Sequence, residues 1–115
     1  MNGNKNTELM RTLSSMIQQL HRIYGDMLTE VVLYGSYARG TQTDESDVDI
    51  AVILAEKPSK NATNAMIDCV SSYELACGKV LSVLDIEAEK YHQWKDTIPF
   101  YQNIQKEGIL LWKAA

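Results

Sequence analysis

The order of helical and strand-like patterns along the chain is the feature that most constrains its fold. Apolar residues recur every three or four positions over 7–24, which predicts an amphipathic helix with Thr7 as its N-cap and Gly25 as its stop. A similar pattern at 62–77 predicts a second helix. A last helix over 97–107 is predicted by Thr97 and Pro99 at its start and Gly108 at its end. Short apolar runs predict strands at 31–34, 47–55, 80–87 and 109–112. This alternation indicates one domain of packed helices and strands.

The lengths of the connections predict how the strands pair. The short link between 31–34 and 47–55 favours an antiparallel pair, whereas the helical crossover between 47–55 and 80–87 favours a parallel pair. A small mixed β-sheet packed with helices follows, in the α/β (α+β) class. We expect the polar residues 1–6 to be disordered and residues 7–115 to form a single domain.

The composition excludes several broad classes of protein. The chain has 115 residues, which suits one domain, and its fifteen acidic and eleven basic residues leave a net charge of −4. Extended nucleic-acid binding needs a basic face and is not expected. No apolar run approaches the ~20 residues of a membrane span, and the first residues lack a signal-peptide pattern. We therefore expect a cytoplasmic protein with no membrane segment.

Residues 35–50 are rich in turn formers and acids, yet they fit none of three common motifs. Tyr37 stands where the dinucleotide-binding fingerprint needs its second glycine. Thr41 stands where a P-loop needs lysine, and Ile50 stands where a calcium loop needs glycine. The segment therefore has to be interpreted from its own residues.

Gly35 and Ser36 directly follow a predicted strand and open this turn-rich segment. Amides at such a junction point outward, and glycine lets a bulky anion approach the backbone. The Ser36 hydroxyl adds a hydrogen-bond donor, so the pair predicts a phosphate-binding turn. Arg39 is the only nearby positive charge, and we expect it to contact the same nucleotide.

Asp47 and Asp49 alternate along the next predicted strand, so both side chains leave the same face. Two carboxylates this close repel each other unless a cation lies between them. Mg²⁺ suits this position, because it is usually held by one or two carboxylates together with phosphate oxygens. The two aspartates therefore predict a magnesium site beside the phosphate-binding turn.

A third carboxylate is expected, because two-metal nucleotidyl transfer needs a further ligand and a base for the incoming nucleophile. Asp85 lies within the apolar strand at 80–87, where an unpaired acid is costly to bury. We therefore predict that Asp85 joins Asp47 and Asp49 as a catalytic residue and metal ligand. Glu87 shares the strand face of Asp85 and is the alternative.

Gly35-Ser36, ten further residues and then Asp47-x-Asp49 resembles the signature of the DNA polymerase beta nucleotidyltransferase superfamily. The likeness is carried by Gly-Ser-Tyr-Ala-Arg-Gly at 35–40 and Ser-Asp-Val-Asp-Ile at 46–50. These strings resemble the minimal branch of the superfamily, which includes small antitoxin subunits paired with HEPN-domain toxins. The resemblance covers about residues 30–112.

This resemblance implies a fold, a reaction and a role for each site residue. The fold would be that of a nucleotidyltransferase, like the palm of polymerase beta. Gly35 and Ser36 would hold the nucleotide triphosphate. Asp47 and Asp49 would bind Mg²⁺, with two ions expected, and Asp85 would help to activate the acceptor hydroxyl. The implied reaction transfers a nucleoside monophosphate, AMP from ATP, to a hydroxyl acceptor and releases pyrophosphate.

The resemblance also implies a protein partner. The predicted site and the elements that carry it use most of the chain, so the acceptor must either be small or bring its own binding surface. A partner protein is the more economical choice. A HEPN-like toxin is the first candidate, and a helical substrate-binding subunit is the second. The alternative function is that of a non-catalytic antitoxin that occludes its partner.

Overall fold

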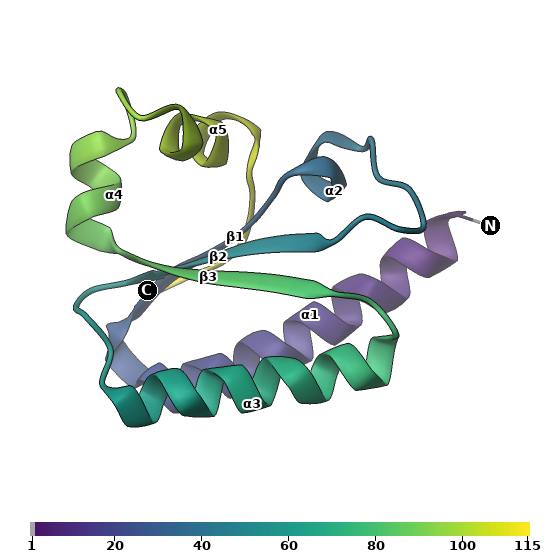
Figure 1. The fold of residues 1–115 in the computed structure, drawn as a ribbon, viewed down its shortest axis with the longest axis horizontal. Coiled ribbons are helices and arrows are strands. Elements are labelled where there is room, and N and C mark those ends of the chain that lie inside the picture. Colours follow the sequence, from purple (N-terminus) through teal and green to yellow (C-terminus); the bar gives the residue numbers. More distant parts are fainter. Residues whose placement is uncertain (1) are drawn as a thin grey trace.

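The computed structural model describes the backbone of residues 2–115 and the side chains of residues 7–115 (Figure 1). Its helices are α1 (Asn2–Tyr24), the short 3-10 helix η1 (Gly25–Met27), α2 (Ser36–Arg39), α3 (Lys60–Cys77), α4 (Ala88–Trp94) and α5 (Pro99–Glu107). Its strands are β1 (Leu28–Tyr34), β2 (Val48–Leu54), β3 (Leu81–Glu87) and β4 (Ile109–Lys113).

The four strands form one mixed sheet in the order β3-β2-β1-β4. β2 and β3 are parallel, whereas β1 is antiparallel to both β2 and β4. The predicted mixed sheet is confirmed, and so are the predicted parallel and antiparallel pairs. β3 and β4 are the outer strands, so each has one edge with no strand partner among residues 2–115.

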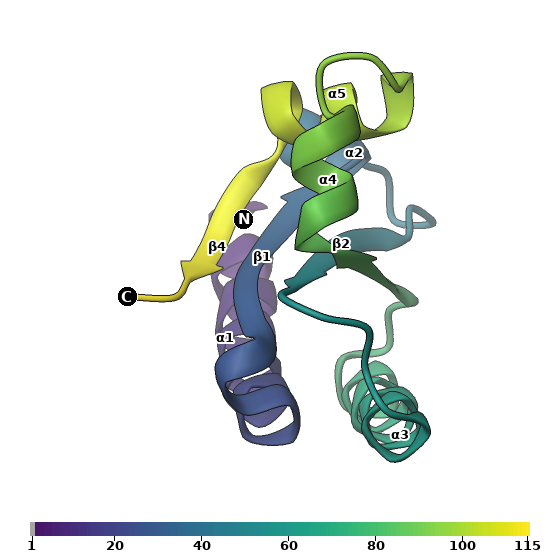
Figure 2. The ribbon, with the colours of Figure 1, turned by 90° about the vertical axis from the view of Figure 1, so that its left-hand side faces the viewer.

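Helices cover both faces of the sheet (Figure 2). α1 and α3 pack on one face, which we call the α3 face, and α4 and α5 pack on the other, which we call the α5 face. In β2, Ile50 and Val52 join the core on the α3 face, whereas Ala51 and Ile53 join a smaller cluster on the α5 face. The face of any strand residue paired with β2 therefore follows from its register.

Local sequence explains both ends of α3 and the start of α5. The Ser59 hydroxyl accepts a hydrogen bond from the Ala62 amide at 3.1 Å and so caps α3, which ends at Gly78 with a φ of 69°. Pro99 lies in the first turn of α5. The predicted helix start at Thr7 is wrong, because α1 begins at Asn2 and Thr7 lies inside it.

Two further expectations concern the chain start and the membrane. The disorder expected for residues 1–6 stays a prediction, and Met1 lies outside the described residues. Among residues 2–115, no helix combines the length and apolar character needed to span a bilayer.

Candidate functional site

The candidate site begins at the junction of β1 and α2. Gly35 links them with φ 72° and ψ −154°, a backbone conformation that is essentially restricted to glycine. The amides of Ala38 and Arg39 both donate to the Gly35 carbonyl at 3.1 Å and close the short helix. The amides at the start of α2 have no intrahelical acceptor, as at any helix start. The predicted strand-to-turn junction is therefore present.

Gly35 packs directly against Asp49. A Cβ atom on Gly35 would overlap Oδ2 of Asp49 and lie 3.1 Å from its Cγ. The antiparallel register explains this contact, because Tyr34 of β1 pairs with Asp49 of β2. The structure thus brings the turn and one of the predicted metal ligands into contact.

Asp47 and Asp49 flank Val48, which is fully buried in the core on the α3 face. Alternation along β2 therefore directs the Asp49 carboxylate to the α5 face. Asp47 directly precedes the strand and lies close enough for its charge to act on Asp49. Asp47 is exposed and Asp49 is partly buried. Burial raises the pKa of Asp49 above its ordinary value, the charge of Asp47 raises it further, and Arg39 opposes the shift. The two carboxylates therefore act on each other as a repelling pair.

The prediction that Asp85 completes this cluster is wrong. Asp85 pairs with Val52, which faces the α3 side, so Asp85 lies on the face of the sheet opposite to Asp49. Burial raises the pKa of Tyr24 on α1, and the charge of Asp85 accordingly raises it further. Among the described residues, no group of three or more His, Cys, Asp or Glu side chains could hold a metal ion.

The alternative, Glu87, fails for the same reason, because it pairs with Leu54 and shares the face of Asp85. The β3 residue that pairs with Asp49 is Ser82, whose side chain is exposed on the α5 face. A shift of three residues from Ser82 to Asp85 reverses the direction of the side chain. The sequence carries no signal for this register, so pattern reasoning could not choose between the faces.

Arg39 lies at the rim of the site and forms an ion pair with a residue of α5. Its Nη1 donates to Oε2 of Glu107 at 3.2 Å, and both side chains are exposed. Because Arg39 also lowers the pKa of Asp49, its charge acts at the predicted metal site. Arg39 is thus placed between the carboxylates and a surface glutamate.

Sequence reasoning missed Tyr34 as a neighbour of the site. Its pKa is raised, first by burial and then by the charge of Asp49. Its ring meets that of Phe100 edge-on, with the ring centroids 5.7 Å apart. The available signal was its place directly before Gly35, two residues from Val32, which is buried on the α5 face.

The residues present fit one divalent cation better than the predicted pair of ions. Asp47 and Asp49 repel each other, and a hard cation between them would offset the repulsion that raises the pKa of Asp49. The predicted ligand set for two ions needed Asp85, which lies on the opposite face. The arrangement can therefore hold a cation and an anionic group side by side at Asp49 and Gly35.

The chain belongs to a known enzyme family. Residues 15–115 match the family described as Polymerase beta, Nucleotidyltransferase, so the chain is a nucleotidyltransferase. It is 34% identical over 68 residues to MJ0141 of Methanocaldococcus jannaschii, covering 59% of this chain and 69% of that protein. It is 28% identical over 102 residues to MJ0604 of the same organism, covering 89% and 96%. The names of both proteins assign them to the protein adenylyltransferases.

A third relative is the protein adenylyltransferase MntA of Shewanella oneidensis. It is 31% identical over 112 residues, which are 97% of this chain and 66% of MntA. These relatives place the chain among proteins named for AMP transfer to other proteins.

Solved structures share the fold. A nucleotidyltransferase structure from Sulfolobus solfataricus has a TM-score of 0.62 and 20% identity, covering 96% of this chain and 85% of that one. A toxin-antitoxin structure with AMP-PNP has a TM-score of 0.58 and 24% identity, covering 87% and 73%. The Shewanella oneidensis complex of a tri-AMPylated HEPN toxin with its MNT antitoxin has a TM-score of 0.50 and 18% identity, covering 99% and 74%. The predicted fold is confirmed.

Proposed function

We propose that this chain transfers AMP from ATP to a hydroxyl group on a partner protein. The observation that carries the proposal is the contact between Gly35 and Asp49, which joins a turn suited to phosphate with a carboxylate suited to Mg²⁺. Relatives named protein adenylyltransferase support AMP transfer to protein. Because the reaction consumes ATP, a cytoplasmic location is part of the proposal.

Each site residue has a part in this proposal. Gly35 and Ser36 bind the triphosphate, and Arg39 offers its guanidinium to a phosphate oxygen. Asp47 and Asp49 would hold a magnesium ion, which when bound would neutralise charge on the phosphates. The acceptor oxygen then forms a bond to the α-phosphorus, the bond to the β-phosphate oxygen breaks, and pyrophosphate leaves. The hydroxyl proton is released to water.

We propose a partner that resembles a HEPN toxin, since one structural neighbour is described as an AMPylated HEPN toxin bound to its antitoxin. A helical substrate-binding subunit is the second candidate. The alternative function, occlusion of a partner without catalysis, is favoured by one observation. Within the described residues, no third carboxylate accompanies Asp47 and Asp49, so the site lacks a side chain that the transfer reaction was expected to use.

Labelled nucleotides test the proposal and separate it from the alternative. The tagged chain is purified with its partner from its native cell and incubated with Mg²⁺ and ATP labelled at the α- or the γ-phosphate. We expect the partner to gain label from α-labelled ATP only. The Asp49→Asn variant should lose this transfer, whereas the matched Asp85→Asn variant on the opposite face should keep it. A partner that binds but is never labelled would contradict transfer and support occlusion.

A further inference from the structure

β3 has an open edge that begins just after Leu81. The Leu81 amide donates to Oε2 of Glu74 at 2.9 Å, so it points away from β2. By contrast, the carbonyl of the preceding residue, Val80, accepts from Val48 beside β2 at 2.9 Å. Because these directions alternate along a strand, the amides and carbonyls of Val83 and Asp85 also point away from the sheet. Unpaired groups of this kind are a template for another strand.

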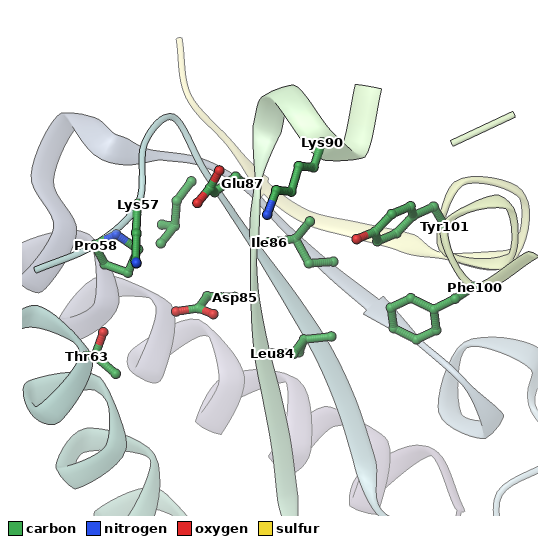
Figure 3. Close-up of a pocket in the computed structure, with 11 residues that line it drawn as sticks. Lys57, Pro58, Thr63, Leu84, Asp85, Ile86, Glu87, Lys90, Phe100 and Tyr101 are labelled. Atoms are coloured by element: carbon green, nitrogen blue, oxygen red, sulfur yellow. The ribbon is translucent and has the colours of Figure 1, made fainter. Parts of the chain in front are cut away.

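A cavity of about 470 Å³ straddles this open edge. Figure 3 shows β3 crossing it, with side chains pointing to either side in alternation. Asp85 lies on one side with Lys57 and Thr63. Leu84 lies on the other side with Phe100, and both of these apolar side chains are 41% exposed. The cavity thus has a polar half and a largely apolar half, separated by the strand itself.

The charged side chains that line the cavity indicate the class of ligand that it binds. Lys57 and Lys90 are balanced by Asp85 and Glu87, so the lining has no net charge to select a triphosphate or a nucleic-acid strand. Among the described side chains, these four residues form no ion pair. A neutral ligand rich in hydrogen-bonding groups suits such a lining. An extended peptide is such a ligand, because its main chain pairs with a strand edge while alternate side chains enter pockets on either side.

The open edge also leads to the candidate site. Leu84 and Ser82 point to the same face of β3, and Ser82 pairs with Asp49 of β2. A peptide strand added to β3 would therefore place alternate side chains first against Leu84 and then beside Ser82. There, neighbouring strands are ~4.8 Å apart, so the peptide residue would start about two strand spacings from Asp49.

From these contacts we propose that the open edge of β3, with its cavity, binds an extended segment of the protein acceptor as a fifth strand of the sheet. The segment carries an apolar residue over Leu84 and its acceptor hydroxyl residue beside Ser82. This inference rests on the proposed function, because it names how the acceptor reaches that site. It concerns binding of the peptide main chain, which can be measured without transfer.

A proline substitution tests the main-chain pairing. Asp85→Pro removes an outward amide and places a ring at the open edge, while the ladder to β2 is kept because that amide does not face β2. Asp85→Ala is the matched control, since it removes the carboxylate and leaves the amide. The probes are dodecapeptides selected from a random display library on the immobilised full chain with AMP-PNP and Mg²⁺.

We expect selected peptides to slow hydrogen exchange at the Val83 and Asp85 amides. Their affinity should fall at least tenfold in Asp85→Pro and less than threefold in Asp85→Ala. Nucleotide affinity and the circular dichroism spectrum should be unchanged in both variants. Leu84→Glu, which adds a charge to the apolar half, should also weaken peptide binding without loss of fold.

Three results would overturn the proposal: no peptide selected, protection of amides elsewhere in the chain, or equal affinities for the proline and alanine variants. Displacement of the peptides by a single-stranded oligonucleotide would point to a nucleic-acid ligand and would also overturn it. The Asp49→Asn variant separates this proposal from the proposed function. It should lose AMP transfer and still bind the selected peptides, so either proposal can fail while the other stands.

Discussion

Gly35 lies so close to Asp49 that a single added carbon at Gly35 would overlap the Asp49 carboxylate. Gly35, which directly follows β1, and Asp49, near the start of β2, therefore form one packed unit. This unit depends on the antiparallel pairing of the two strands, which sets Tyr34 opposite Asp49. The predicted phosphate-binding turn at Gly35 and the Asp49 carboxylate are therefore in van der Waals contact without a ligand between them.

Gly35→Ala should abolish nucleotide binding, because the methyl group displaces the Asp49 carboxylate and fills the approach to the backbone. Gly40→Ala is a matched control. Gly40 has a similar φ, 75° against 72°, but a Cβ there meets no atom within 4 Å. Gly40→Ala should lose about 1–2 kcal/mol in unfolding free energy, because Gly40 is in the αL conformation. Gly35→Ala should lose more, because the conformation of Gly35 is essentially restricted to glycine. Titration calorimetry with ATP and Mg²⁺ should detect a loss of affinity only in Gly35→Ala, and equal affinities would contradict the assignment.

Divalent cations should bind at Asp47 and Asp49 and not at Asp85. We expect a Mn²⁺ titration, followed by electron paramagnetic resonance, to show one site in the free chain. Asp47→Asn and Asp49→Asn should each weaken this site strongly, because each removes a charged ligand. Asp85→Asn should leave it unchanged, since Asp85 lies across the sheet. A second site that disappears in Asp85→Asn would restore the three-carboxylate prediction.

The ion pair between Arg39 and Glu107 should compete with the nucleotide for the guanidinium. Glu107→Gln releases Arg39, so we expect ATP affinity to rise by about two- to threefold, within the range of an exposed ion pair. Arg39→Gln should lower ATP affinity. Neither change should alter the melting temperature appreciably, because both side chains are exposed and such pairs contribute about 0–1 kcal/mol. Unchanged ATP affinity in both variants would remove Arg39 from the nucleotide site.

Tyr24→Phe should leave the protein equally stable or more stable at pH 7. The Tyr24 hydroxyl is buried and has no hydrogen-bond partner among the described residues, so its removal could stabilise the fold by up to about 1 kcal/mol. Tyr73→Phe is the control, because it breaks a 2.8 Å hydrogen bond with Ser15 and should be slightly destabilising. Urea unfolding of the three proteins measures both effects, and a clear loss of stability in Tyr24→Phe would contradict the first.

The same tyrosine predicts a pH dependence. Burial, with smaller contributions from Asp85 and Cys69, raises the pKa of Tyr24 from 10.0 to about 12. Since the folded state holds this proton more tightly than the unfolded state, the stabilisation is complete below pH 10 and is lost as the pH rises towards 12. The stability difference between the wild-type chain and Tyr24→Phe should therefore change between pH 10 and 12 and stay constant from pH 7 to 9.

The sequence predicts the elements of this fold better than it predicts their contacts. The Gly35 turn, the Asp47-x-Asp49 spacing and the parallel crossover all depend on neighbouring residues, and local patterns predict them. The sequence predicts no helix over α4, because its three regularly spaced apolar residues, Ala88, Tyr91 and Trp94, are too few for a helical period to appear. The position of Asp85 depends on the register between β2 and β3, which is a tertiary property.

The burial of β2 on both faces of the sheet also determines which parts of the site can move. Local opening of this strand would expose side chains on both faces of the sheet at once, so it should be among the rarest fluctuations of the molecule. Asp49 is carried by this strand, whereas Arg39 sits on a four-residue helix at the surface. The Asp49 carboxylate therefore keeps its position when a ligand binds. Adjustment to the ligand occurs at Arg39, on the faster timescale of surface loops.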